Sequence, residues 1–317
     1  MTRASKLPKR LQPMLATLID APFDDPDWVF ETKWDGFRMI AAIDAGRVTL
    51  YSRNGKIISD SYRPVADALV GLKDGTVLDG ELVALDRHGI SHFQLLQNAL
   101  RAEASLRYCV FDLMFAGGAD LRSLPLTERK QRLRQLLPKH PLLSFSSHRR
   151  THGTSLFHAA EAKGLEGIVA KRSQSPYLSG VRSADWLKIK TARRQEVVIV
   201  GFTAPRGARA FFGALLLAVR DGQGWRYVGR VGTGFTQASL SELYAELRRR
   251  RTTASPIGAR LKDTAGTTWV KPELVAEVKF SEWTQAGEMR HPVFLGLRQD
   301  KRPQQVTREV EKVRRRR

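Results

Sequence analysis

Short apolar segments separated by turns recur along this chain and limit the fold to one built mainly from strands. Segments with the length and composition of strands are residues 28–32, 37–43, 48–52, 77–85, 108–115, 165–172 and 186–190. In the same part of the chain, helices are expected at residues 62–72, 93–101, 126–137 and 154–163. Residues 7–23 are expected to form an irregular lead-in with one short helix, and residues 138–152 are expected to be irregular. This pattern predicts an α+β fold with antiparallel sheets.

The composition changes around residues 191–195, where a second domain is expected to begin. Further strands are expected at residues 196–202, 211–219, 225–231 and 273–283. They surround one amphipathic helix, residues 237–250, with a candidate capping box in Ser239 and Glu242. Short strands around one helix predict a small β-barrel of the oligonucleotide-binding (OB) type. The predicted domains are therefore residues 1–192 and 193–317, and the second ends in a basic tail.

The charge of the chain indicates the kind of partner it binds. The formal net charge is +21 and the pI is about 10.6. Such a field attracts polyanions, and nucleic acid is the leading candidate. A membrane surface is disfavoured, because the densest basic runs lack a matching apolar face. Basic stretches suited to backbone phosphates are residues 206–209, 248–251 and 314–317.

Several residue types point away from secretion, metals and thiol chemistry. Residues 1–10 are basic but no apolar signal core follows them, and the longest apolar run, residues 211–219, is too short to span a bilayer. The single cysteine, Cys109, is expected to be a small buried hydrophobe. Four histidines do not have the spacing of metal ligands and are expected to be solvated: His140, His148, His152 and His158. We expect a soluble, cytoplasmic and monomeric protein that does not bind membranes.

One stretch carries the residue types for chemistry at a phosphate: Glu31-Thr32-Lys33-Trp34-Asp35-Gly36-Phe37-Arg38. An amine attacks phosphorus only when it is unprotonated, which near neutral pH requires neighbouring cations or burial. Glycine at position 36 would let the backbone turn tightly beside a ligand. Taken alone, however, the stretch is better explained as an exposed charged strand followed by a turn.

Two strands carry charged residues in pairs. Because side chains alternate along a strand, Asp79 and Glu81 project from the same face about 7 Å apart. Two acids on an apolar strand are costly unless they are paired or bound to a ligand, which favours a ligand role. Lys188 and Lys190 share a face with Trp186 and form either a phosphate cradle or a solvated sheet face.

Arg53 and Phe111 have local settings that fit more than one role. Arg53 lies at a strand end in the turn of residues 52–55, where ligand contact and plain solvation are equally compatible with the sequence. Phe111 lies within an apolar strand, and core packing is the better local interpretation.

The ordered set of motifs resembles the ATP-dependent DNA ligases of the covalent nucleotidyltransferase superfamily, and in particular the ligase module of bacterial end-joining ligases. The motifs are Glu31 to Arg38, Ser52-Arg53-Asn54-Gly55, Asp79-Gly80-Glu81, Phe111-Asp112-Leu113, Glu166-Gly167-Ile168-Val169-Ala170-Lys171, Trp186-Leu187-Lys188-Ile189-Lys190 and Arg298-Gln299-Asp300-Lys301. They cover roughly residues 7 to 302. The resemblance implies an adenylation domain followed by an OB-fold domain.

The resemblance also implies a three-step reaction that uses ATP with Mg²⁺, or with Mn²⁺ as an alternative. Lys33 would attack the α-phosphorus of ATP and release pyrophosphate. The AMP would pass to the 5′-phosphate of a nick, and the 3′-hydroxyl would then displace it and seal the strand. Each step is an in-line displacement at phosphorus, so positioning and charge neutralisation should dominate catalysis.

Residue roles follow from the matched positions. Phe111 would stack on adenine, Glu31 would read its edge, and Glu81 would bind the ribose hydroxyls. The residues implied to contact phosphates are Arg38, Arg53, Lys188 and Lys190, and the implied metal ligand is Glu166. Residues of the second domain would act on the leaving pyrophosphate, which requires the barrel to close over the site; these are Arg298, Asp300 and Lys301.

The implied setting is repair of nicked or broken duplex DNA at the bacterial nucleoid by non-homologous end joining, with a Ku-type end-binding protein and a repair polymerase as partners. An additional N-terminal DNA-binding domain and fused polymerase or phosphoesterase modules do not fit in this length. A minimal two-domain ligase is therefore expected, either free-standing or excised from a larger protein. The alternatives are an RNA ligase or capping guanylyltransferase of the same superfamily and a non-catalytic nucleic-acid-binding protein.

Overall fold

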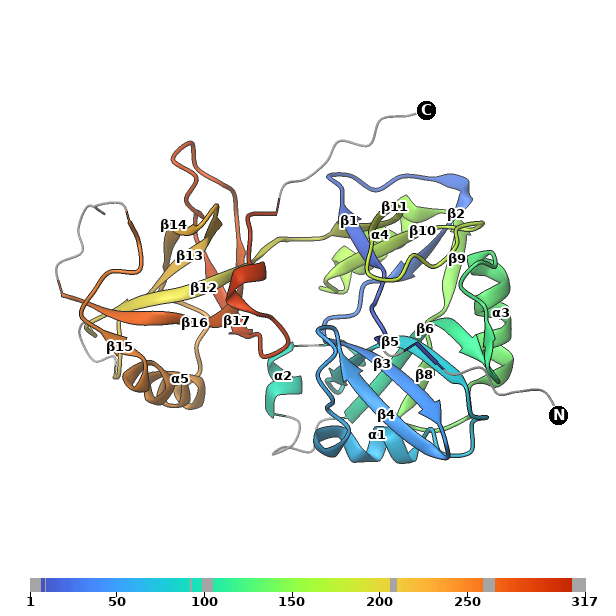
Figure 1. The fold of residues 1–317 in the computed structure, drawn as a ribbon. Helices are drawn as coiled ribbons and strands as arrows, with labels where there is room; N and C mark the ends of the chain where they lie inside the picture. The colour runs from blue at the N-terminus through green and yellow to red at the C-terminus, as the bar shows by residue number, and fades with distance from the viewer. Residues whose placement is uncertain are drawn as a thin grey trace. The chain divides into compact units, whose positions relative to one another are not determined.

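The computed structural model describes residues 7–8, 10–91, 93–98, 105–205, 210–258 and 266–309. The chain divides into two compact units, one up to Thr191 and one that begins at Ala192 (Figure 1). Three predicted features lie outside the described residues: the basic stretches 206–209 and 314–317, and the end of the helix expected over residues 93–101.

The first sheet of the first unit has the strand order β4-β3-β5-β6-β7, with β8 paired to β6. Its strands are β3 (Phe37–Asp44), β4 (Arg47–Ser52), β5 (Thr76–Leu85), β6 (Ser105–Ala116), β7 (Ala119–Asp120) and β8 (Leu143–Phe145). All pairings are antiparallel except that of β6 with β8. Apolar side chains from three helices pack into the core of this sheet: α1 (Arg63–Asp67), α2 (Phe93–Asn98) and α3 (Leu126–Leu136).

The second sheet of this unit has the order β1-β11-β10-β2-β9. Its strands are β1 (Leu15–Leu18), β2 (Asp25–Thr32), β9 (His148–Thr151), β10 (Gly167–Arg172) and β11 (Arg182–Lys190). Helix α4 (Gly153–Ala162) packs Ala160 against apolar side chains of β2, β10 and β11. A separate apolar cluster joins the two sheets, since it contains Ile40 of β3, Phe111 of β6 and Trp186 of β11. The sheets therefore share a core at the place where several motif residues lie.

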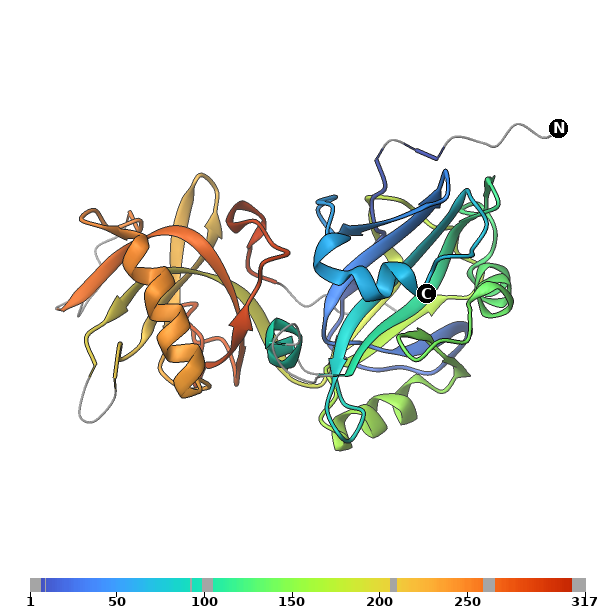
Figure 2. The ribbon, with the colours of Figure 1, turned by 90° about the horizontal axis from the view of Figure 1, so that it is seen from below.

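The second unit is one curved sheet of order β14-β13-β12-β16-β15, with β17 paired to β16. Its elements are β12 (Arg193–Thr203), β13 (Leu215–Asp221), β14 (Gly224–Val231), α5 (Gln237–Arg249), β15 (Arg251–Thr252), β16 (Thr267–Phe280) and β17 (Val293–Leu297). Helix α5 lies beside the long strand β16 (Figure 2). It buries Leu240, Leu243 and Leu247 in the core of this unit. Over the described part of the chain, no helix is long and apolar enough to cross a membrane.

The predicted strands of the first unit are confirmed, and the differences lie in short elements. The lead-in forms strand β1 rather than a helix, and the segment expected to be irregular contains β8 and β9. These strands exist because they pair with β11, β6 and β2, which are distant in sequence. The helix expected over residues 62–72 ends at Asp67, and turns follow it.

Two local predictions in the second unit are wrong. The capping box of α5 uses Thr236 as the N-cap with Ser239 at the third position, and not Ser239 with Glu242. Strand β13 begins at Leu215 and not at Phe211, whose φ of 74° is left-handed and incompatible with an extended strand.

Gly36 connects β2 to β3 and has a packing role that the sequence did not reveal. A Cβ atom at this position would lie 2.1 Å from the carbonyl oxygen of Leu82 in β5. The nearest atom that the Cβ would meet belongs to the backbone of Leu82, which cannot move aside without disturbing the pairing of β3 with β5. Glycine is therefore required for close approach to β5.

Gly36→Ala should lower the free energy of unfolding of the first unit by about 2–4 kcal/mol, because the new Cβ would overlap main-chain atoms of Leu82. Chemical denaturation followed by circular dichroism would measure the change. Gly258→Ala is the matched control, since a Cβ there meets nothing within 4 Å. If both variants unfolded at the same denaturant concentration as the parent, the steric role of Gly36 would be wrong.

Candidate active site

Lys33 and Glu166 form an ion pair at neighbouring strand ends. The Nζ of Lys33 lies 2.6 Å from Oε2 of Glu166, and the two side chains are 21% and 5% exposed. The pairing of β2 with β10 brings these residues together, and the backbone N–H of Lys33 donates to the carbonyl of Gly167 at 2.9 Å. The amine predicted as a nucleophile is thus held by a carboxylate, and it can attack only after losing a proton and leaving this contact.

Lys190 and Lys188 lie on β11, the next strand of the same sheet. Lys190 pairs with Gly167, and Lys188 pairs with Val169. Both lysines are partly exposed, whereas Trp186 on the same strand is 1% exposed. The backbones of Lys33, Gly167 and Lys190 are therefore adjacent across three strands, and the structure brings together residues from three separate motifs.

Glu31 lies in a buried charged cluster instead of facing solvent. Its Oε1 accepts a hydrogen bond from Lys130 Nζ at 2.8 Å, and its Oε2 accepts from Lys171 Nζ at 3.1 Å and Ser146 Oγ at 3.2 Å. Glu31, Lys130 and Lys171 are each at most 2% exposed. With one acid and two lysines the cluster carries one excess positive charge. We name the residues Glu31, Lys130, Lys171 and Ser146 the Glu31 cluster.

Charge coupling within the Glu31 cluster shifts its pKa values. Burial alone would raise the pKa of Glu31, but attraction to Lys130 and Lys171 outweighs it and lowers the pKa below its ordinary value. Burial lowers the pKa of Lys171 to about 8; attraction to Glu31 opposes this shift, and repulsion from Lys130 adds to it. Burial therefore disfavours the charged form of Lys171, whereas the two ammonium groups favour the ionised form of Glu31.

His148 lies beside this cluster, opposite Glu31 in the pairing of β2 with β9. The ring is only partly exposed, so the prediction that all four histidines are solvated is wrong for His148. Burial lowers the pKa of His148, and repulsion from Lys130 lowers it further. The imidazole is therefore neutral at pH 7 and adds no charge to the cluster.

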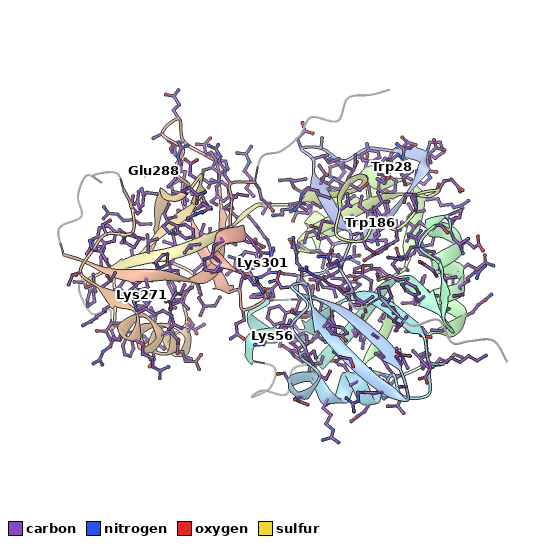
Figure 3. The ribbon with its side chains drawn as sticks, viewed as in Figure 1. Trp28, Lys56, Trp186, Lys271, Glu288 and Lys301 are labelled. Atoms are coloured by element: carbon purple, nitrogen blue, oxygen red, sulfur yellow. The ribbon has the colours of Figure 1, made fainter. Side chains whose placement is uncertain are left out.

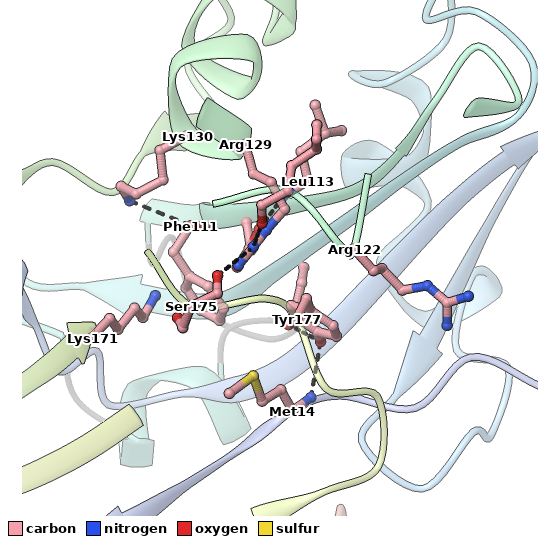
Figure 4. Close-up of polar contacts among 12 residues, drawn as sticks. Met14, Phe111, Leu113, Arg122, Arg129, Lys130, Lys171, Ser175 and Tyr177 are labelled. Atoms are coloured by element: carbon pink, nitrogen blue, oxygen red, sulfur yellow. Dashed lines mark hydrogen bonds and ion pairs between the residues drawn. The ribbon is translucent and has the colours of Figure 1, made fainter. Parts of the chain in front are cut away.

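Phe111 and Trp186 form an aromatic wall next to Lys171. The Nζ of Lys171 lies 4.2 Å from the centroid of each ring. The guanidinium carbon of Arg38 lies 4.5 Å from the Phe111 centroid. Phe111 is only 7% exposed and belongs to the core between the sheets, so it serves packing as well as the site. Lys171 and Phe111 appear side by side in Figure 4.

Arg38 is bound by Asp79, which is fully buried. Its Nε and Nη2 each donate to one carboxylate oxygen of Asp79 at 2.6 Å, and Nη2 also donates to the carbonyl of Met14. Tyr177 donates its hydroxyl proton to Asp79 at 2.5 Å. The expectation that Asp79 serves a ligand is therefore wrong, because protein groups occupy both of its oxygens.

Glu81 and Arg53 are the remaining predicted site residues of the first unit. Glu81 lies opposite Arg38 in the pairing of β3 with β5 and is partly exposed. Arg53 is partly exposed in the turn that follows β4, which is closed by the hydrogen bond from Gly55 N–H to the carbonyl of Ser52.

The three predicted residues of the second unit bind partners within that unit. Arg298 pairs with both oxygens of Asp300 at 2.9 and 2.8 Å and with Glu277 at 2.9 Å. Lys301 lies 2.7 Å from Glu196 (Figure 3 labels Lys301). Burial would raise the pKa of Asp300, but the charge of Arg298 outweighs it and lowers the pKa. Lys301 lowers the pKa of Glu196 in the same way, also against burial.

Asp300→Asn should lower the stability of the second unit at pH 7 by about 3 kcal/mol, because it leaves Arg298 buried with one carboxylate. The sign of the pH effect follows from the lowered pKa values of Asp300 and Glu196. Their stabilisation is present above their ordinary pKa values near 4 and is lost as the pH falls through the lower folded values. Thermal unfolding between about pH 6 and about pH 3 should therefore show a smaller acid-induced loss in the variant. Glu288→Gln, at an exposed carboxylate, is the control; an identical acid dependence in Asp300→Asn would contradict the assignment.

Sequence reasoning missed Lys130, Lys171 and Ser146 as site residues. Lys171 lies within a recognised motif, so its position could have been noted. Lys130 lies on the buried stripe of α3 together with Leu126 and Leu133. A lysine at helical spacing from buried leucines is a signal of a paired interior cation, and it was available in the sequence.

Metal binding is compatible with Glu166 but not with a preformed protein cage. In the part of the chain that the structure describes, no group of three or more His, Cys, Asp or Glu side chains could hold a metal ion. Mg²⁺ commonly binds through one or two carboxylates and completes its shell with substrate phosphates and water. Glu166 therefore fits an ion that arrives with a nucleotide.

The chain matches known proteins over both units. It matches the family model "ATP dependent DNA ligase domain" over residues 13–190 and the model "ATP dependent DNA ligase C terminal region" over residues 208–301. It is 40% identical over 312 residues to the multifunctional non-homologous end joining protein LigD of Pseudomonas aeruginosa, covering 95% of this chain and 37% of that protein. It is 38% identical over 304 residues to LigD of Mycobacterium tuberculosis, covering 94% of this chain and 40% of that protein. The chain thus spans less than half the length of these curated relatives.

A solved structure of mycobacterial DNA ligase D complexed with ATP and MES is also similar. It matches with a TM-score of 0.71 and 36% identity, covering 94% of this chain and 98% of that one. The predicted fold class is confirmed: a nucleotidyltransferase domain is followed by an OB-like domain. The domain models and the similarity to LigD show that this chain belongs to the family of ATP-dependent DNA ligases.

Proposed function

We propose that this chain seals nicks or breaks in duplex DNA through an AMP carried on Lys33. The observation that carries the proposal is the contact of the Lys33 amine with Glu166, beside the strand that bears Lys188 and Lys190. An amine, a carboxylate and two further cations at neighbouring strand ends suit attack on a nucleotide phosphate. The matched ligase models and the end-joining names of the relatives support DNA as the substrate.

In the first step the Lys33 nitrogen attacks the α-phosphorus of ATP, and the bond to pyrophosphate breaks. The ion pair keeps the amine next to its target until Glu166 turns to other partners. Mg²⁺, or Mn²⁺ in its place, would neutralise phosphate charge when bound at Glu166. Lys188 and Lys190 would hold the α-phosphate, which is present in all three steps.

The base and ribose would lie against the aromatic wall. Phe111 would stack on adenine, Glu31 would help to read the edge of the base, and Glu81 would bind the ribose hydroxyls. Arg53 and Arg38 would contact phosphates. Since Asp79 and Met14 occupy Nε and Nη2 of Arg38, its Nη1 is the group left for such a contact.

The proposed setting is break repair by end joining, supported by the names of the relatives. A Ku-type end-binding protein and a repair polymerase are the proposed partners, and a monomer is the proposed state. An RNA ligase or a capping guanylyltransferase is the second candidate, because it would use the same lysine chemistry. Labelling with GTP in place of ATP, and sealing of nicked RNA in place of nicked DNA, would distinguish them.

Lys33→Ala should abolish formation of the AMP adduct, because it removes the nucleophilic nitrogen. Intact mass before and after incubation with ATP and Mg²⁺ measures the adduct directly. Sealing of a nick that already carries 5′-AMP should persist, since that step needs no lysine nucleophile. Lys56→Ala, at an exposed lysine, is the control and should be labelled like the parent. An adduct on the Lys33→Ala protein at a comparable rate would refute the assignment.

Lys301→Gln should slow adduct formation by about 10²-fold and slow sealing of a pre-adenylylated nick much less. The proposed reason is that Lys301 stabilises charge on the leaving pyrophosphate, which exists only in the first step. Single-turnover rates of both reactions would measure the effect. Equal defects in the two reactions would overturn this role and leave the ligase assignment intact.

A further inference from the structure

Lys130 makes an unusually complete set of contacts for a lysine outside the recognised motifs. It projects from α3 and is 1% exposed. Its Nζ donates to Glu31 Oε1 at 2.8 Å, to the carbonyl of Ser146 at 2.9 Å and to the carbonyl of Phe111 at 3.3 Å. Figure 4 shows Lys130 with its contact to Phe111. An ammonium has three N–H donors, so each has an acceptor inside the protein.

The three acceptors belong to different parts of the first unit. Glu31 is on β2 of one sheet, and Phe111 is on β6 of the other. Ser146 lies between β8 and β9, and its hydroxyl also donates to Glu31. A single ammonium therefore sets the position of a carboxylate in one sheet relative to an aromatic residue in the other.

Lys130 also controls the charge around Lys171. Lys171 shares Glu31 with Lys130 and places its ammonium against the rings of Phe111 and Trp186. The charged groups that act on Lys171 are Glu31 from β2, Lys130 from α3 and Asp112 from β6. Because Lys130 repels Lys171, removing the charge of Lys130 should make Lys171 hold its proton more tightly.

We propose that Lys130 is a positioning residue for nucleotide binding, which holds Glu31 and the Phe111 strand in the geometry that accepts the base of ATP. The inference rests on the proposed function, since it assigns the base to Glu31 and Phe111. Lys130 touches neither the phosphates nor Lys33 in this role. Its loss should therefore weaken binding of ATP and leave the rate of phosphoryl attack at saturation nearly unchanged.

The test compares Lys130→Met, which keeps an unbranched apolar stem without the charge, with the parent chain. Single-turnover formation of the AMP adduct is measured against ATP concentration between pH 7 and 9.5. The half-saturating ATP concentration should rise by about 10- to 100-fold, as for loss of other supporting contacts, while the maximal rate changes by less than about 3-fold. For the parent we expect the half-saturating ATP concentration to change with an inflection near pH 8, where Lys171 loses its proton, and for the variant we expect this inflection at higher pH.

Arg132→Met is the matched control, because it removes a cation from the exposed face of the same helix. Arg132→Met should leave the half-saturating ATP concentration and the pH dependence of this concentration unchanged. If Lys130→Met does not fold, Ser146→Ala removes the hydroxyl that also binds Glu31 but keeps the carbonyl that binds Lys130, and should raise half-saturation by a smaller factor.

The outcomes separate this inference from the proposed function. A parent chain that forms no AMP adduct would refute the proposed function. A parent that forms the adduct, with Lys130→Met losing maximal rate at unchanged half-saturation, would overturn the positioning role alone. An unchanged half-saturating ATP concentration at every pH in Lys130→Met would also overturn the positioning role. If Ser146→Ala has to be used instead, an unchanged half-saturating ATP concentration in that variant would overturn the role in the same way.

Discussion

The buried carboxylate of Glu31 is central to the first unit, because it accepts hydrogen bonds from side chains in separate parts of the chain. It receives Lys130 from α3, Lys171 from β10 and the hydroxyl of Ser146. A buried carboxylate without partners would cost several kcal/mol, so these contacts are needed for β2 to lie where it does. Lys130 also donates a hydrogen bond to the carbonyl of Phe111, which connects the charged cluster to the apolar core between the sheets.

The Glu31 cluster holds more positive than negative charge in the interior of the first unit. Two lysines against one carboxylate leave one excess positive charge, and burial makes that excess unfavourable in isolation. Burial is the main reason why the pKa of Lys171 is lowered to about 8, and repulsion from Lys130 contributes to it. Arg38 differs, because Asp79 already neutralises it.

Much of the fold was predictable from the sequence because the long strands carry a clear apolar pattern. Strands β5 and β6 are mostly buried, and apolar residues dominate both sequences although Asp79, Glu81 and Asp112 interrupt them. The short strands β8 and β9 were not predictable, since a segment such as His148–Thr151 has no apolar alternation and becomes a strand only by pairing with β2. The second unit was recognisable for the same reason, although the start of β13 depended on a left-handed φ at Phe211.

The candidate site was predictable as a set of motifs but not as a network. Lys33 and Glu166 were named from their motifs, and the structure brings them into contact. The roles assigned to the individual site residues remain proposals. Asp79 was expected to serve a ligand, and its actual partner, Arg38, could not be identified because the two residues are not opposite each other: in the pairing of β3 with β5, Arg38 lies opposite Glu81 and Asp79 lies opposite Ile40. Lys130 was missed because a lysine on a helix is usually solvated. Only its spacing from the buried leucines distinguishes a buried, paired lysine from a solvated one.

The dipeptide Glu166-Gly167 explains why the ion pair at Lys33 can form at all. Gly167 has a φ of 150°, and a Cβ atom there would lie 2.1 Å from the carbonyl oxygen of Ile189. Only glycine allows β10 to approach β11 this closely at the point where the strand begins. The carbonyl of the same glycine accepts the backbone N–H of Lys33, so the residue that permits this approach also places the lysine. The side chain of Glu166, one position before Gly167, then contacts the amine of Lys33.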